Sequence, residues 1–157
     1  MILSLHSIAG AVLASNSRNI WEAIIIGLTS HYFFDSIPHI EYKIENIKTG
    51  NFKIAIKDYV KVFIDLLIGL LVILYLIKNV ATPQILIILA GGFFAIIPDG
   101  FAFLNFFVKN KHRNLITKFL SKHSEIHTKI HSATTNKFIA TASQFIIAAI
   151  LLFAILK

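Results

Sequence analysis

The sequence predicts an all-α polytopic membrane protein: a transmembrane helical bundle of four spans, with a short N-terminal segment and an interfacial amphipathic helix. Of the 157 residues, 56% are hydrophobic and only 15% are charged, and the mean hydropathy is +0.74, whereas soluble domains carry roughly 25% charged residues. The apolar residues form long runs between short polar stretches, which is typical of membrane-crossing helices. The sequence has no Pro-, Gly- or Ser-rich linker and no internal repeat, so residues 1–157 are expected to form one domain.

The expected helices follow these apolar runs in order along the chain. Residues 2–15 form a short apolar segment that either crosses the membrane or enters it half way, and it lacks the basic region that opens a signal peptide. In a later run, Gly91 and Gly92 permit close helix contact and Pro98 predicts a kink. The four runs expected to cross the membrane are residues 20–37, 62–77, 85–108 and 138–156.

The charge of the chain is concentrated between the expected spans. The formal net charge is +7, and most lysines lie in residues 41–61 and 109–137. The positive-inside rule places both stretches in the cytoplasm and the C-terminus outside, for a protein integral to the cytoplasmic (inner) membrane. Because these lysines flank membrane spans, the expected partners are membrane lipids with anionic head groups, and nucleic acid is not expected. The oligomeric state stays open.

One stretch of the sequence has the spacing of a metal site. From Ser30 to His39 it reads SHYFFDSIPH, and on a helix His31 and Asp35 emerge on one face, one turn apart. Pro38 disfavours helix in the residue before it, so His39 is expected to turn towards the same helix end. The chain has no cysteine, so a metal here must be held by nitrogen and oxygen ligands. A plain hydrogen bond between His31 and Asp35 is the alternative.

A second group of histidines lies on the predicted amphipathic helix of residues 115–132. On a helical wheel at roughly 100° per residue, His123, His127 and His131 fall on the same half as the apolar residues. The lysines, Lys129 among them, fall on the other half. These imidazoles are therefore expected to face the bundle or the lipid interface, at ligand spacing along the helix.

Three further ionisable residues, His6, Asp65 and Asp99, are expected in the same leaflet, His6 on the condition that the first segment starts inside. Each alone has a simpler interpretation. Asp65 can cap a helix or pair with Lys61, and Asp99 can accept a hydrogen bond from a backbone amide freed at Pro98. Ionisable groups are costly in hydrocarbon when they have no partner, so the convergence of several on one leaflet favours a shared metal or catalytic site.

Four short elements, spread along nearly the whole chain, resemble those of a known family. His6, residues 30–39, Pro98-Asp99 and residues 127–132 look like elements of small bacterial integral membrane proteins related to the YdjM-like membrane-bound metal-dependent hydrolases. The resemblance implies that His6 matches the early histidine of the family, Asp35 with His39 its middle element, and His131 with Ser132 the end of its late element. This chain has one aspartate where the family has a pair, and it has no arginine between its late histidines.

These features lead to one functional hypothesis, a metal-dependent hydrolase acting on a phosphoester or similar bond of a lipid or amphiphile at the cytoplasmic membrane face. Zinc is the first choice of metal, manganese or iron are alternatives, and the site is expected to hold one or two ions. The expected catalytic residues are His31, Asp35 and Asp99, and Lys129 is expected to bind an anionic head group. The expected metal ligands are His31, Asp35, Asp99, His127 and His131, with His6, His39, Asp65 and His123 as secondary candidates. The alternatives are a metal-ion or proton transporter that uses the same residues, and a membrane scaffold without catalytic activity.

Overall fold

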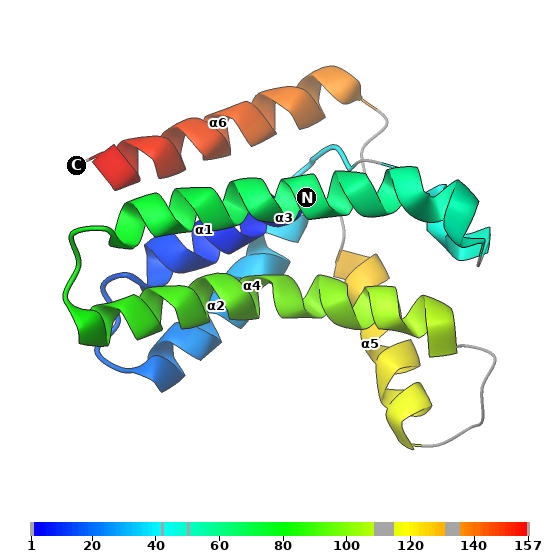
Figure 1. The fold of residues 1–157 in the computed structure, drawn as a ribbon, viewed down its shortest axis with the longest axis horizontal. Coiled ribbons are helices and arrows are strands. Elements are labelled where there is room, and N and C mark those ends of the chain that lie inside the picture. The colour runs from blue at the N-terminus through cyan, green and yellow to red at the C-terminus, as the bar shows by residue number, and fades with distance from the viewer. Residues whose placement is uncertain (1, 42, 50, 109–114, 131–135, 157) are drawn as a thin grey trace.

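The computed structural model describes residues 2–41, 43–49, 51–108, 115–130 and 136–156. In these ranges the chain is all-α, as expected, with six α-helices and one short 3-10 helix. Figure 1 shows α3, α4 and α6 running roughly along the long axis of the molecule, with α5 at a steep angle near one end of α4. The helices are α1 (Leu3–Ala14), α2 (Ile20–Asp35), η1 (Glu45–Thr49), α3 (Phe52–Ile77), α4 (Thr82–Val108), α5 (Leu115–Ile130) and α6 (Lys137–Leu156).

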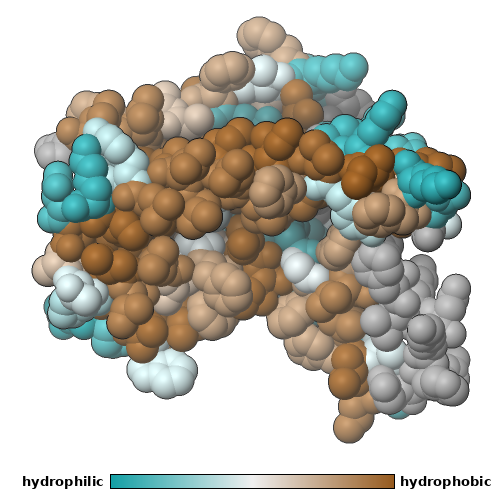
Figure 2. Space-filling model, viewed as in Figure 1, coloured by the Kyte–Doolittle hydropathy of each residue, from teal (hydrophilic) through white to brown (hydrophobic). Residues whose placement is uncertain are grey.

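Three of these helices, α3, α4 and α6, are long and apolar enough to cross a membrane, which indicates an integral membrane protein. Figure 2 shows a broad hydrophobic surface over the long helices and hydrophilic residues towards the ends of the molecule. The span expected at residues 20–37 is shorter than predicted, because α2 has 16 residues and ends at Asp35. At about 1.5 Å per residue α2 is about 24 Å long, less than the roughly 30 Å of a hydrocarbon core.

The polar stretch at residues 41–61 is only partly a loop. The side chain of Asn51 accepts a hydrogen bond from the amide of Lys53 (3.1 Å) and caps α3, so this helix begins at Phe52, well before the expected residue 62. The fully buried carboxylate of Asp58 accepts hydrogen bonds from the amide of Asn46 (2.9 Å) and from Lys61 Nζ (3.0 Å). Asp58 therefore ties η1 to the first turns of α3.

The short apolar segment expected at residues 2–15 forms α1, which is buried over most of its length and contacts α2, α3, α4 and α6. Small residues let its neighbours approach closely. A Cβ atom added at Gly91 of α4 would overlap the Ala14 side chain and the Gly10 carbonyl, both on α1. The backbones of α1 and α4 are therefore packed too closely for any larger side chain at this point, as in other helix contacts built on small residues.

The later helices lie close to the ranges expected for them. α4 is one continuous helix from Thr82 to Val108 with Pro98 inside it, so the proline does not end the helix, and the kink expected there stays a prediction. The amphipathic helix α5 buries Leu120, and most of its other apolar residues are exposed. Its exposed apolar residues are Leu115, Ile116, Phe119, Ile126 and Ile130. An exposed apolar side on a basic helix is typical of helices that lie at a membrane interface.

Candidate metal centre

Four side chains from three helices converge at the end of α2. His31 and Asp35 lie one turn apart on α2, Asp99 follows Pro98 on α4, and His127 lies on α5. Each offers one nitrogen or oxygen atom, and these four atoms all lie within 4.8 Å of one another. They form a group of two imidazoles and two carboxylates that can hold a metal ion.

The separations between these atoms match those of ligands around one ion. His31 Nε2 lies 3.0 Å from His127 Nε2, 3.2 Å from Asp35 Oδ2 and 4.0 Å from Asp99 Oδ1. His127 Nε2 lies 3.0 Å from Asp35 Oδ2 and 3.3 Å from Asp99 Oδ1. Ligands about 2.0 to 2.1 Å from a tetrahedral ion lie about 3.3 to 3.4 Å from one another. Four of these five separations lie within about 0.3 Å of that spacing, and the fifth, between His31 and Asp99, is longer at 4.0 Å.

The orientation of His31 leaves its metal-facing nitrogen without a proton in the neutral ring. Its Nδ1–H donates a hydrogen bond to the carbonyl of Ala95 on α4 (2.8 Å), because a carbonyl can only accept. The lone pair of a neutral His31 is then on Nε2, which faces Asp35 Oδ2. Metal-binding histidines commonly have their other ring nitrogen on a backbone carbonyl, since this bond fixes the tautomer and the ring direction.

His127 Nε2 lies among three other atoms that can bind a cation. His31 Nε2 and Asp35 Oδ2 are each 3.0 Å from it, and Asp99 Oδ1 is 3.3 Å from it. A cation at the centre satisfies all four atoms, and a divalent ion also neutralises two carboxylates in a buried place.

The electrostatics at His127 also favour positive charge. Burial disfavours the charged imidazole, but the carboxylates of Asp35 and Asp99 outweigh burial and raise the pKa of His127 to about 9. The same surroundings that hold a proton on His127 attract a cation. A metal ion at this place must displace that proton, because only a neutral imidazole binds a metal.

The second oxygen of Asp35 is held on its other side. His6 Nε2 on α1 lies 3.0 Å from Asp35 Oδ1, and both side chains are buried. His39 Nε2 is also near this oxygen, at 3.9 Å. The structure thus brings His6 and His39 to Asp35, although neither belongs to the group of four.

The exposed fraction of the side chain rises from 0% at His31 to 23% at Asp99, so the site is reached from the side of Asp99.

The remaining secondary candidates lie in other surroundings. Asp65, on α3, accepts hydrogen bonds from the amides of Leu3 (2.8 Å) and Ser4 (3.3 Å) at the start of α1. It therefore caps a helix, as one of its simpler interpretations suggested, and the helix that it caps is α1 rather than α3. His123 Nε2 lies 2.9 Å from the Tyr32 hydroxyl. Burial, with the neighbouring charge of His127, lowers the pKa of His123.

Two predicted residues of the late segment have different outcomes. Lys129 is exposed on α5 and its Nζ lies 2.6 Å from Glu125 Oε1, so its ammonium group pairs with a carboxylate of its own helix. His131 lies outside the residues that the structure describes, so its expected place in the site stays a prediction. The same holds for any contribution of residues 131–135 to the site.

Several contacts at the site were not expected from the sequence. The carbonyl of Ala95 has no sequence signal, because any residue supplies one. Tyr32 was adjacent to His31 in the sequence, and its hydroxyl contact with His123 joins α2 to α5. Glu41, two residues after His39, has its Oε1 3.6 Å from His39 Nε2. Only the short spacing between these two residues could have indicated that contact.

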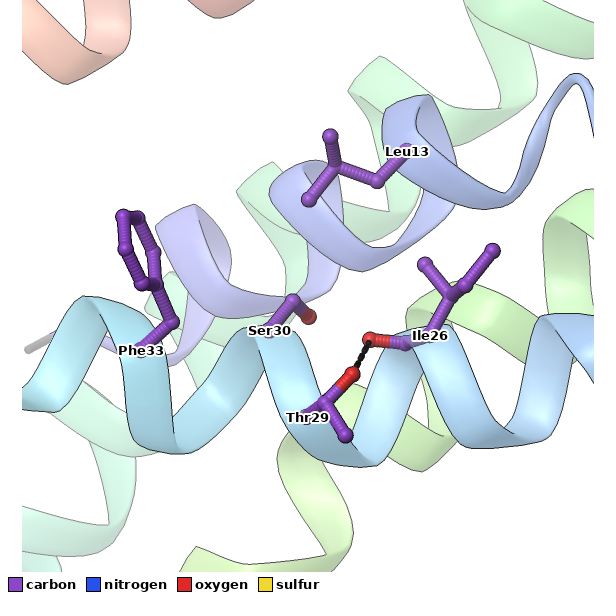
Figure 3. A pocket seen from close by; sticks show the side chains of 5 residues that line it. All are labelled: Leu13, Ile26, Thr29, Ser30 and Phe33. Carbon is purple, nitrogen blue, oxygen red and sulfur yellow. Dashed lines mark hydrogen bonds between the residues drawn. The ribbon is translucent and has the colours of Figure 1, made fainter.

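An apolar groove lies between α1 and α2, on the helix that carries His31. It has a volume of about 430 Å³ and is lined by Leu13, Ile26, Thr29, Ser30 and Phe33, as Figure 3 shows. Its two hydroxyl groups are turned to backbone carbonyls of α2, with Thr29 donating to Ile26 (3.2 Å) and Ser30 donating to Gly27 (2.8 Å). The groove therefore offers a mostly apolar surface rather than a polar binding site.

The fold and the site together define an all-α, membrane-type protein with a buried His/Asp group that can bind a metal. No protein-family model, no curated protein and no solved structure matches the chain. The site must therefore be interpreted from its own chemistry, and the resemblance noted in the sequence stays a prediction.

Proposed function

We propose that this protein is a metal-dependent hydrolase that acts on a phosphoester or similar bond of a lipid or amphiphile at the cytoplasmic face of the membrane. The observation that supports it most is the convergence of His31, Asp35, Asp99 and His127, whose ligand atoms all lie within 4.8 Å of one another. Intramembrane ionisable groups are functional more often than not, because their burial is costly. The resemblance to YdjM-like hydrolases agrees with this assignment.

The donor set favours a first-row divalent ion. Two imidazole nitrogens and two carboxylate oxygens suit zinc first, and manganese or iron as alternatives. When bound, such an ion lowers the pKa of a water molecule towards neutrality and stabilises negative charge on phosphoryl oxygens. The chain contributes a rigid donor set, since His31 is fixed by the Ala95 carbonyl and Asp35 by His6.

The four residues differ in their access to a substrate. His31 and Asp35 are buried, so they are assigned to holding the ion. Asp99 is 23% exposed and lies at the open side of the group. Its carboxylate is therefore the one placed to take a proton from the attacking water or to be displaced when a substrate binds.

The surroundings of the site suit an anionic amphiphile. The exposed face of α5 carries the lysines Lys118, Lys122 and Lys129, which can attract an anionic head group to the side where Asp99 is reached. Lys129 would exchange its pairing with Glu125 for that group. The groove between α1 and α2 offers an apolar surface for an acyl chain. Cytoplasmic orientation follows from the lysine-rich stretches by the positive-inside rule.

The test is hydrolysis by the purified protein in detergent micelles. A chromogenic phosphodiester and a short-chain fluorescent phospholipid should both be cleaved after loading with zinc, and a chelator should abolish cleavage. Asp99→Asn should lower kcat by about 100-fold or more, the typical contribution of a general base. Asp58→Asn, which alters a buried carboxylate outside the group, is the matched control and should retain activity. Metal-loaded protein without hydrolysis, but with ion uptake into liposomes, would favour the transporter alternative.

A further inference from the structure

α5 is attached to the rest of the protein through few residues. It packs mainly against α4 and also contacts α2, and Figure 1 shows it at a steep angle near one end of α4. Among the residues of α5, only Leu120 is buried. The ring of Phe119 lies 5.7 Å from that of Phe101 on α4, but Phe119 is itself 56% exposed. Because so little apolar surface of α5 is covered, we expect single polar contacts to decide how firmly this helix is held.

Two neighbouring residues of α2 face two residues of α5 that are one helical turn apart. His31 Nε2 lies 3.0 Å from His127 Nε2, and the hydroxyl of the next residue, Tyr32, lies 2.9 Å from His123 Nε2. His123 precedes His127 by four residues, so both imidazoles project from the same side of α5. The two helices therefore meet at two points, and one of these points carries a candidate metal ligand.

His123 contributes to this attachment rather than to the group of four. It is not among the four side chains whose ligand atoms lie within 4.8 Å of one another. Its ring lies 5.5 Å from that of Phe101, and its Nδ1 is buried with no hydrogen-bond partner in the described part of the chain. The contact with Tyr32 is therefore the one hydrogen bond that this imidazole makes there. Loss of the Tyr32 hydroxyl would leave the ring unsatisfied, which is unfavourable when the helix stays in place.

We propose that Tyr32 is a positioning residue of the metal centre, which holds α5 through His123 and so keeps His127 beside His31 and Asp35. The ring of Tyr32 packs edge-on against His31, with centroids 5.3 Å apart and planes at 89°, so the hydroxyl has a fixed place relative to these residues. A metal ion binds more tightly when a larger fraction of the chains already has every ligand in place. This inference rests on the proposed metal centre, and it gives His123 a role other than that of a ligand.

The experiment measures the zinc affinity of the whole chain in detergent, by competition with a chromophoric chelator. Tyr32→Phe keeps the ring and removes only the hydroxyl, and it should weaken zinc binding by about tenfold, the low end for residues that orient a ligand. Tyr75→Phe is the matched control and should bind zinc like the wild type, because Tyr75 lies beside Lys78 at the end of α3. Unchanged affinity in Tyr32→Phe would overturn the inference and leave the metal centre standing. No zinc binding by the wild-type protein would overturn both.

Variants at His123 separate a hydrogen bond to Tyr32 from direct binding of the metal. His123→Gln places an amide near the position of Nε2 that can pair with the Tyr32 hydroxyl, so its zinc affinity should stay close to that of the wild type. His123→Phe keeps a ring against Phe101 but cannot form this bond, and it should weaken zinc binding as Tyr32→Phe does. An equal loss of affinity in both His123 variants would identify His123 as a ligand and would overturn the inference.

A double-mutant cycle tests whether Tyr32 acts through His127. Tyr32→Phe should have no further effect on the zinc affinity of a His127→Ala protein, because the ligand that Tyr32 positions is then gone. A loss of about tenfold in both backgrounds would show that Tyr32 acts on the site by another route, and it would overturn the inference.

A distance measurement follows α5 without any metal. The chain has no cysteine, so spin labels can be attached through Trp21→Cys on α2 and Lys122→Cys on α5, both at exposed positions. In the zinc-free protein, Tyr32→Phe should broaden the distribution of distances between the labels, whereas Tyr75→Phe should leave it unchanged. An unchanged distribution in Tyr32→Phe would contradict its role in holding α5 and would overturn the inference.

Discussion

Asp35 is the residue on which the candidate metal centre depends most, so Asp35→Asn is the most informative substitution. In the native structure its carboxylate lies within 3.0 to 3.2 Å of the ring nitrogens of His6, His31 and His127. Loss of a partner that only orients a ligand weakens metal binding by about 10- to 100-fold. Asp35 is a ligand itself, so the dissociation constant should rise by more than about 100-fold, which corresponds to more than about 2.7 kcal/mol.

The affinity can be measured by competition between the detergent-purified protein and a chromophoric zinc chelator. Asp58→Asn is the control, because Asp58 is as buried as Asp35 but contacts Asn46 and Lys61 rather than histidines. That variant should bind zinc like the wild type. An Asp35→Asn protein whose affinity stays within about tenfold of the wild type would refute the assignment, since a lost ligand costs more than that. The His/Asp group would then be a hydrogen-bonded network.

Three further changes test other parts of the structure. Gly91→Ala should lower the free energy of unfolding by about 1 to 3 kcal/mol through overpacking against Ala14. Gly100→Ala is the control and should not lower it, because a Cβ atom added at Gly100 would meet nothing within 4 Å. Thermal unfolding in detergent measures both variants. Zinc binding at pH 8 should release about 0.9 proton from His127, because the pKa of this imidazole is about 9, whereas an imidazole with an unshifted pKa would release about 0.03. The release should fall as the pH rises through 9. Calorimetry in buffers of different ionisation enthalpy measures the number of protons released, and no release at pH 8 would contradict the raised pKa. Asp65→Asn should weaken the cap of α1 by about 1 kcal/mol but leave the zinc content unchanged, and a loss of zinc would return Asp65 to the ligands.

Hydropathy and spacing predicted much of the fold, and for a clear reason. Membrane-length apolar runs are set by the bilayer, so the last span, expected at residues 138–156, is found at Lys137–Leu156. Hydropathy does not distinguish a surface that faces lipid from one that faces protein. It therefore could not show that α1 lies buried among four other helices, and the start of α3 depends on a cap at Asn51 rather than on apolar content.

The candidate site was predictable where it depends on local geometry. The i, i+4 relation of His31 and Asp35, and the position of His127 on the wheel, follow from helix periodicity alone. The structure also places Asp99 beside them. The role of Asp65 was not predictable, because it depends on where the start of α1 lies in space. Asp58 was overlooked for the same reason, since its partner Asn46 belongs to another element.

α5 connects the metal centre with the surface of the protein. On one side it directs His127 into the group of four and packs the rings of Phe119 and His123 against Phe101, with ring centroids 5.7 and 5.5 Å apart. On its other sides it exposes lysines together with apolar residues such as Ile126. A soluble phosphoester would need only the lysines, whereas apolar side chains in water are unfavourable and become favourable at a lipid surface. The helix that supplies a candidate metal ligand is thus also the one suited to the membrane interface, which is the location that the proposed amphiphilic substrate requires.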